Sequence, residues 1–320
     1  MMSLEEFLTE WHNDSPLVLV HTSGSTGTPK PVLVEKRRML ASARVTCDFL
    51  GLKPGDTALL CMSLDYIAGK MMVVRSLERH LQLVTVPPSG KPVWSGTIDF
   101  AAMVPLQVWN LLHDPEGRLR LMQVRHLIIG GSAIDNDLAA ALSGFPNYVW
   151  STYGMTETLS HIALRRLNGP EASQWYTPFP SVKLSLNDEQ CLVIDAPEVC
   201  DECLVTNDIA ELAADGRFKI LGRKDNVICS GGLKIHAEEL ERQLHPHLRV
   251  PFIITKRPDE KFGEMVVLLT EGSVDEARDV CETILPKFHR PRAYVHVDCI
   301  PLTANGKPAR KEAQQLAAGH

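Results

Sequence analysis

The chain has 320 residues, of which 44% are hydrophobic and 22% are charged, and its formal net charge is −6 at pH 7. This composition is typical of a globular protein, and the length allows two domains with a sizeable core. The acidic balance argues against nucleic acid as a partner, and no apolar run is long enough to span a membrane. The first residues are acidic and lack the basic region of a secretory signal, so a cytoplasmic location is expected.

Apolar runs and helical patterns alternate from Leu17 to about Thr152, which predicts a largely parallel sheet with covering helices. Such sheets bind ligands at the loops beyond their strand ends. Helices are expected over residues 36–50 and 67–77. Strands are expected near residues 17–20, 57–62, 81–86, 98–104, 126–129 and 148–152.

The pattern changes after about Pro178. Short alternating runs predict a small antiparallel or barrel-like part, and a smaller α/β unit follows residue 223. Its helices are expected near residues 236–244 and 274–285, and its strands near 252–255 and 265–269. The sequence therefore predicts an α/β protein with a large domain, residues 1–224, and a small domain, residues 225–320.

The segment from Thr22 to Lys30 reads TSGSTGTPK and directly follows the first apolar run. Its glycines allow a sharp turn, and successive N–H groups with hydroxyls and a lysine make an anion-binding loop. The spacing does not match the Walker pattern. The alternative is an ordinary surface turn with a chance lysine. The predicted polyphosphate-binding residues are Thr22, Ser23, Gly24, Ser25, Thr26, Gly27 and Lys30.

Further motifs follow in order: YGMTET at 153–158, TND at 206–208, GRKD at 222–225, SGG at 230–232 and NGK at 305–307. Together with the loop they resemble the core motifs of the adenylate-forming superfamily, which contains acyl- and aryl-CoA ligases, adenylation domains and luciferases. Family members carry a long α/β region before the loop, and most of it is absent here. An apolar face that relatives cover would then be open, so we expect a homodimer that buries it.

The resemblance implies an α/β adenylate-forming fold with a truncated large N-terminal domain and a small mobile C-terminal domain. It also implies the chemistry: a carboxylate attacks the α-phosphate of ATP and releases pyrophosphate, and the thiol of coenzyme A then displaces AMP. ATP, Mg²⁺ and coenzyme A are the implied cofactors. Lys307 would be the catalytic residue that reaches the α-phosphate.

The resemblance assigns further roles residue by residue. Asp208 and Arg223 would contact the ribose, Glu157 would hold Mg²⁺, and Asp225 would be the hinge between the domains. Asn207 is a departure, because relatives often have glycine there. The residues expected to line the nucleotide, acyl and coenzyme A sites are Gly130, Gly131, Ser132, Tyr153, Gly154, Met155, Thr156, Ser230, Gly231 and Gly232.

The segment from Ser63 to Arg75 bears on the acid that is activated. Tyr66 stands where the family usually has histidine, and an aromatic ring there can still close the acyl pocket. The stretch IAGKMMVVR resembles the o-succinylbenzoate–CoA ligases of menaquinone biosynthesis. Arg75 would pair with the carboxylate that is not activated.

Several alternatives stay open at this point. Arg75 could extend to solvent from the end of its helix. The chain could act on another aryl or acyl acid, or load a carrier-protein thiol. It could also be a non-catalytic nucleotide-binding relative.

Overall fold

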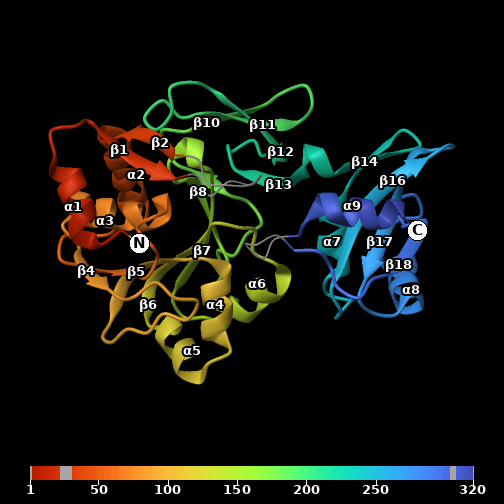
Figure 1. Ribbon diagram of the computed structural model, residues 1–320, viewed down its shortest axis with the longest axis horizontal. Helices are drawn as coiled ribbons and strands as arrows, with labels where there is room; N and C mark the ends of the chain where they lie inside the picture. Colours follow the sequence, from red (N-terminus) through yellow and green to blue (C-terminus); the bar gives the residue numbers. More distant parts are fainter. Residues whose placement is uncertain (1, 22–30, 303–307, 320) are drawn as a thin grey trace.

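The computed structural model describes residues 2–21, 31–302 and 308–319. Figure 1 shows the elements from α1 to β13 in a larger part of the molecule and those from β14 to α9 in a smaller part. The short 3₁₀ helix η2 (Lys224–Asn226) connects the two. Among the described residues, no helix is long and apolar enough to cross a membrane.

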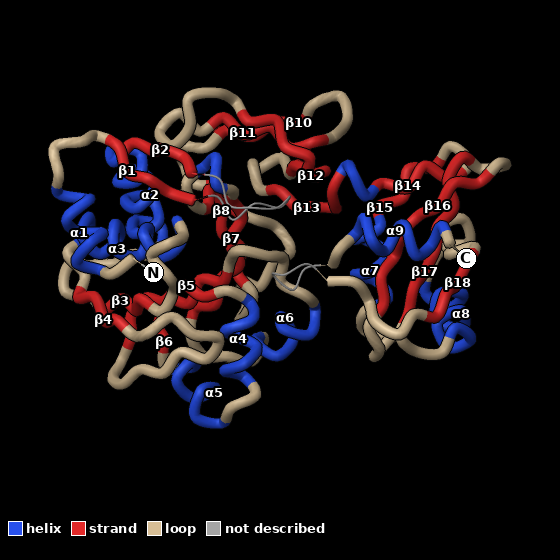
Figure 2. The backbone as a smooth tube through the Cα atoms, in the orientation of Figure 1, coloured by secondary structure: helices blue, strands red, loops and turns tan. Residues whose placement is uncertain are grey.

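A seven-stranded sheet forms the centre of the larger part, in the order β4-β3-β5-β6-β7-β8-β9 (Figure 2). The strands from β3 to β7 run parallel, and β8 and β9 are added antiparallel. The predicted mostly parallel sheet is confirmed, with small shifts at the strand ends. The strands are β3 (Thr57–Leu60), β4 (Gln82–Thr85), β5 (Ile98–Met103), β6 (Val124–Ile129), β7 (Tyr148–Gly154), β8 (His161–Arg166) and β9 (Thr177–Pro178).

Helices cover both faces of this sheet, as is usual for parallel strands joined by crossovers. One face packs against the predicted helices α2 (Lys36–Phe49) and α3 (Ile67–Arg79). The other face packs against α4 (Pro105–Leu112), α5 (Pro115–Met122) and α6 (Asn136–Leu142). The last three helices were not predicted from the sequence, because they are short and owe their stability to packing on the sheet more than to their own hydrophobic periodicity.

Strand β1 (Leu17–His21) does not join the large sheet. It pairs antiparallel with β2 (Pro31–Glu35) in a separate two-stranded sheet. The expectation that residues 17–20 belong to the parallel sheet is therefore wrong. The segment between the two strands, residues 22–30, is shorter than the crossover that a parallel pair requires, so an antiparallel pair is the outcome.

Two helices hold β1 in place. Helix α1 (Leu4–His12) supplies Glu10, whose Oε1 accepts the Leu19 N–H at 3.0 Å. Helix α3 supplies Lys70, which is 2% exposed and whose Nζ donates to the Leu19 carbonyl at 2.5 Å. The two side chains also form an ion pair at 3.5 Å. Both backbone groups of Leu19 are thus fixed a few residues before the predicted phosphate loop.

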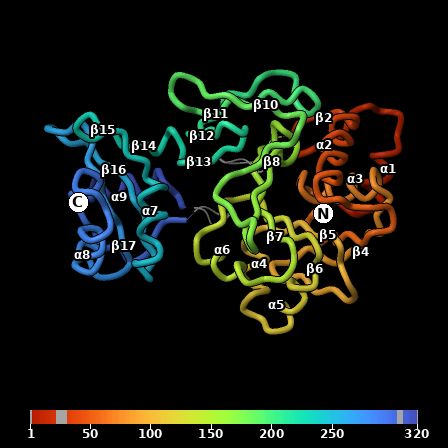
Figure 3. Tube along the Cα trace, turned by 180° about the vertical axis from the view of Figure 1, so that it is seen from behind, coloured from red at the N-terminus to blue at the C-terminus, as the bar shows by residue number. Residues whose placement is uncertain are grey.

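The rest of the larger part is a small antiparallel sheet, visible from behind in Figure 3. Its order is β10-β11-β12-β13, and the described strands form an open sheet. This confirms the antiparallel part predicted after residue 178. Its strands are β10 (Lys183–Leu186), β11 (Cys191–Asp195), β12 (Leu204–Leu212) and β13 (Phe218–Arg223).

The smaller part is a five-stranded sheet with three helices. The order is β15-β14-β17-β16, and β18 pairs in parallel with β17. The two predicted helices and two predicted strands of this unit are confirmed, whereas its other strands and its last helix were not predicted. The elements are β14 (Val227–Ser230), β15 (Leu233–His236), α7 (Ala237–Leu244), β16 (Phe252–Asp259), β17 (Gly263–Thr270), α8 (Val274–Ile284), β18 (Ala293–His296) and α9 (Arg310–Ala318).

Helix α7 contacts the larger part as well as its own sheet. Figures 1 and 3 both show α6 on the side of the larger part that faces α7, and the Asn136 side-chain amide donates to the Arg242 carbonyl at 3.0 Å. Arg242 in turn donates to the Ile220 carbonyl of β13 at 3.3 Å. These two bonds join the smaller part to the larger part in this structure.

A bidentate ion pair anchors the start of α9. Arg310 donates to both oxygens of Glu241 on α7, at 2.9 and 2.6 Å, and to the Ile254 carbonyl at 2.9 Å. We expect Arg310→Met to lower the free energy of unfolding by about 3 kcal/mol, because it leaves a poorly solvated carboxylate without its cation. Urea denaturation checks this, with Arg278→Met as control. The Arg278–Asp275 pair, at 3.8 Å, is largely exposed, and an equal loss in both variants would contradict the anchoring role.

Candidate active site

Part of the predicted site lies outside the described residues. This holds for the candidate catalytic residue Lys307 and for the phosphate loop, namely Thr22, Ser23, Gly24, Ser25, Thr26, Gly27 and Lys30. Their roles stay predictions. The described residues next to Lys307 form an isolated antiparallel bridge between Leu302 and Pro308.

The predicted turn from Gly130 to Ser132 lies at the carboxyl ends of two neighbouring parallel strands, β6 and β7. A Cβ atom on Gly130 would lie 2.3 Å from Thr152 Oγ1, so no larger residue fits without a shift. Gly131 has a φ of +88°, a conformation that favours glycine. The turn therefore packs directly against β7 just before Tyr153, at the edge where such sheets bind ligands.

Tyr153 connects the large sheet to the small antiparallel sheet. Its hydroxyl donates to Asp208 Oδ2 at 2.7 Å, and its ring packs edge-on against Phe218, 5.1 Å between centroids. Burial, together with the Asp208 carboxylate, raises the pKa of the Tyr153 phenol. The hydroxyl therefore stays protonated at neutral pH and acts as a donor to Asp208.

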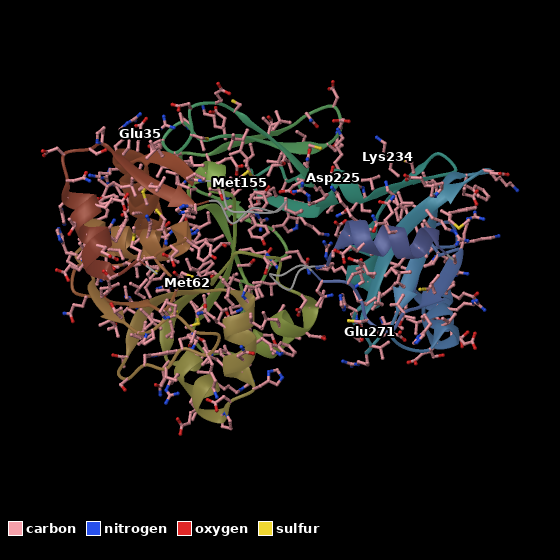
Figure 4. The ribbon with its side chains drawn as sticks, viewed as in Figure 1. Glu35, Met62, Met155, Asp225, Lys234 and Glu271 are labelled. Atoms are coloured by element: carbon pink, nitrogen blue, oxygen red, sulfur yellow. The ribbon has the colours of Figure 1, made fainter. Side chains whose placement is uncertain are left out.

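Asp208 and Arg223, both predicted site residues, lie opposite each other on β12 and β13. Arg223 Nη1 is 3.2 Å from Asp208 Oδ1, and its Nη2 is 3.1 Å from Asp225 Oδ2. The structure thus brings together Tyr153, Asp208, Arg223 and Asp225. Figure 4 shows Asp225 at the junction of the two parts, between Met155 in the larger part and Lys234 in the smaller.

The YGMTET motif begins in the last two residues of β7 and continues into a tight turn. Its last residues make the 3₁₀ helix η1 (Thr156–Thr158), and the Met155 N–H donates to Thr158 Oγ1 at 3.0 Å. Leu159 has a φ of +63°, which is uncommon for a residue other than glycine. A Cβ atom on Gly154 would lie 2.4 Å from the Ser160 carbonyl oxygen. The turn therefore folds the chain back so that Ser160 lies against Gly154.

Arg75 lies inside the larger part and is 2% exposed. The alternative in which it extends to solvent is therefore wrong. Its Nη2 donates to Ser160 Oγ at 2.7 Å, so it is attached to the turn that carries the YGMTET motif. Burial lowers the pKa of the guanidinium to about 10, which leaves it charged at neutral pH. Among the residues that the structure describes, its guanidinium donates to Ser160 Oγ and to the Met72 sulfur, and to no carboxylate.

Two other predicted groups are not linked to this cluster by described contacts. Tyr66 is the N-terminal capping residue of α3 and is 49% exposed. Ser230, Gly231 and Gly232 form the tip of the β14–β15 hairpin, where the two glycines have φ values of +58° and +85°. A two-residue hairpin loop needs such angles, so the turn itself explains both glycines.

Three side chains that are linked to Arg75 by hydrogen bonds, directly or through one another, were not predicted from the sequence: Ser160, His161 and Thr46. Ser160 and His161 follow the YGMTET motif after Leu159, and this closeness to the motif was the available signal. Thr46 lies on α2 and carries no motif. Only the packing of α2 and α3 on the sheet brings it to His161.

A family model described as AMP-binding enzyme matches residues 5–201, which is more than half of the chain. The chain belongs to the AMP-binding enzyme family. A solved relative described as an acyl-CoA synthetase (AMP-forming)/AMP-acid ligase II-like protein, from Dyadobacter fermentans, is 31% identical with a TM-score of 0.68. That match covers 98% of this chain and 92% of the relative.

More distant relatives of the AMP-binding family are longer. The 2-succinylbenzoate–CoA ligase of Lactococcus lactis is 24% identical, and the match covers 92% of this chain and 70% of that protein. The o-succinylbenzoate coenzyme A synthetase of Bacillus subtilis, solved with ATP and magnesium ion, is 23% identical with a TM-score of 0.72, covering 92% and 69%. The predicted adenylate-forming fold and the assignment as an AMP-forming ligase are confirmed. Enzymes of this kind use ATP, Mg²⁺ and coenzyme A.

Proposed function

We propose that this AMP-binding family member is an acid–CoA ligase whose substrate carries two carboxylates, with o-succinylbenzoate as the leading candidate. One carboxylate is activated by ATP, and the resulting acyl-adenylate is attacked by the coenzyme A thiol. The names of the relatives from Lactococcus lactis and Bacillus subtilis support this substrate.

The proposal rests on one observation: Arg75 is buried and has no carboxylate partner among the described residues. A buried guanidinium is normally paired with a carboxylate or a similar anion, because an isolated buried charge is unfavourable. Arg75 is buried, charged and attached through Ser160 to the YGMTET turn, with no carboxylate beside it in the described chain. Its Nε has no hydrogen-bond partner there. A second carboxylate on the substrate would satisfy these donors.

The remaining roles follow the family resemblance and the geometry. Residues 1–224 would form the domain that binds ATP and the acid, and residues 225–320 the small domain that turns about Asp225. Asp208 keeps acceptor sites free beside its bonds to Tyr153 and Arg223, which suits contact with a ribose. Lys307, together with the phosphate loop, would stabilise the charge that develops on the α-phosphate.

A magnesium ion would fit the exposed carboxylate of Glu157. Mg²⁺ is usually held by one or two carboxylates together with substrate phosphates and water, so a cage of protein ligands is not required. Glu157 lies on η1 and forms no ion pair among the described residues. When bound, the ion neutralises phosphate charge and orients the triphosphate.

The test is a panel of acids assayed by pyrophosphate release and by thioester formation with free coenzyme A. We expect o-succinylbenzoate to give the highest kcat/KM, and simple benzoates and fatty acids to give far lower values. Equal rates for mono- and dicarboxylates would overturn the assigned substrate. Pyrophosphate release without thioester formation would favour a carrier-loading enzyme, and the absence of both would favour a non-catalytic relative.

We also propose that the chain forms a homodimer through the outer face of the β1–β2 sheet. Leu19 and Leu33 lie opposite each other on that face and are 38% and 62% exposed. A second copy would cover this apolar pair. Sedimentation at micromolar concentration, with Leu33→Lys as the disrupting variant, tests the proposal. A monomeric mass for the unaltered chain would refute it.

A further inference from the structure

A continuous chain of hydrogen bonds leads from Arg75 across the interior to helix α2. Arg75 Nη2 is 2.7 Å from Ser160 Oγ, and Ser160 Oγ is 3.3 Å from His161 Nδ1. On the other side of the ring, His161 Nε2 is 3.1 Å from Thr46 Oγ1, which is 3.0 Å from the Ser42 carbonyl oxygen. These groups come from α3, the YGMTET turn, β8 and α2.

The chemistry of the two ends fixes the direction of every bond in this chain. The Ser42 carbonyl can only accept, so Thr46 gives it its single hydroxyl proton and must accept from His161 Nε2–H. At the other end, Arg75 can only donate, so Ser160 Oγ accepts from it. The Ser160 hydroxyl can then donate its proton to His161 Nδ1. In the neutral ring this nitrogen carries a lone pair and accepts the hydrogen bond.

A protonated ring would break this pattern. His161 would then present a second donor to Ser160 and place a positive charge next to that of Arg75. Burial lowers the pKa of His161 well below its ordinary value, and the charge of Arg75 adds to the effect. The ring is therefore neutral at neutral pH, in the one tautomer that the geometry allows.

Within residues 2–21, 31–302 and 308–319, Arg75 itself is held by one strong acceptor. Besides the bond to Ser160, its Nη1 contacts the Met72 sulfur, a weak acceptor, at 3.9 Å, and its Cζ lies 6.0 Å from the centre of the Phe100 ring. Ser160 is therefore the contact that sets where the guanidinium points. His161 fixes the direction of the Ser160 hydroxyl. The imidazole ring therefore orients the Ser160 oxygen that accepts from Arg75.

We infer that His161 is a positioning and specificity-determining residue. With its proton held on Nε2 by Thr46, it turns the Ser160 oxygen toward Arg75, so that the other guanidinium donors stay available for the substrate's second carboxylate. The inference rests on the proposed function, because it assumes that Arg75 receives that carboxylate. It assigns to His161 an effect on the choice of acid and no part in the adenylation chemistry.

The first experiment measures how strongly enzyme variants with a substitution at His161 prefer a dicarboxylate over a monocarboxylate. Glutamine has one donor and one acceptor at its end and can keep both bonds, whereas leucine can keep neither. We expect His161→Leu to reduce the ratio of kcat/KM for o-succinylbenzoate over benzoate about tenfold, through KM, and His161→Gln to stay within about threefold of the unaltered enzyme. An unchanged ratio in a folded His161→Leu variant would overturn the inference.

A second variant covers the case in which His161→Leu does not fold. Thr46→Val keeps the shape of the side chain but removes the acceptor for Nε2–H. We expect it to lower the same ratio in the same direction, and no change would contradict the inference. If Arg75→Leu leaves the ratio intact, the proposed function itself fails. If Arg75→Leu abolishes the preference while both His161→Leu and Thr46→Val keep it, only the role of His161 fails.

A spectroscopic measurement is independent of the substrate. Nitrogen-15 NMR of histidine-labelled protein distinguishes the two neutral tautomers and the charged ring. We expect one buried ring, absent in His161→Gln, to be neutral and protonated at Nε2 at neutral pH. A charged ring, or a proton on Nδ1, would overturn the arrangement.

Discussion

Lys307→Ala is expected to slow acyl-adenylate formation by about 100- to 1000-fold, because a cation aimed at developing phosphate charge is worth several kcal/mol in a dry site. The second half-reaction should be nearly unaffected, since the family resemblance implies that the small domain, which carries Lys307, turns about Asp225 before the thiol attacks, and Lys307 would then no longer lie at the phosphate. The two steps are measured separately, by pyrophosphate release and by thioester formation from supplied acyl-adenylate.

Lys311→Ala is the matched control for this prediction. Lys311 is exposed and lies in the first turn of α9, close in sequence to Lys307. It should change neither step by more than about twofold, as expected for a surface lysine. An equal loss in both half-reactions of Lys307→Ala would contradict the assigned role and point to a general loss of structure.

Arg75→Leu is expected to raise KM for o-succinylbenzoate by about 30- to 1000-fold, the effect of removing one partner of a buried hydrogen-bonded charge pair. KM for benzoate should change little, because benzoate has no second carboxylate that Arg75 could bind. The measurement is pyrophosphate release over a range of acid concentrations.

Two comparisons make the Arg75 result specific. Arg75→Lys keeps the charge but loses the planar pair of donors, so we expect an intermediate KM for the dicarboxylate. Arg79→Leu removes another arginine of the same helix, one that pairs with Asp48, and should leave both KM values unchanged. If Arg75→Leu affected benzoate and o-succinylbenzoate equally, Arg75 would be a structural residue and not a substrate contact.

The parallel sheet and most of the small unit could be predicted because their strands are local runs of apolar residues. The order of motifs along the chain likewise identified the adenylate-forming resemblance without any coordinates. The pairing of β1 with β2 was not predicted, because the sequence of one apolar run does not indicate which other strand it will pair with. Short helices such as α6 were missed for a related reason, because their stability comes from the sheet they cover.

For the site, the sequence by itself determined the family, the candidate phosphate loop and the expected chemistry, because these depend on residue types at fixed spacing. Only the tertiary structure decided that Arg75 is buried and not at the surface, that Asp208 holds both Tyr153 and Arg223, and that Thr46 supports His161. Each of these facts depends on contacts between residues far apart in the chain. Burial and hydrogen-bond direction arise from such contacts, and no local pattern of residues encodes them.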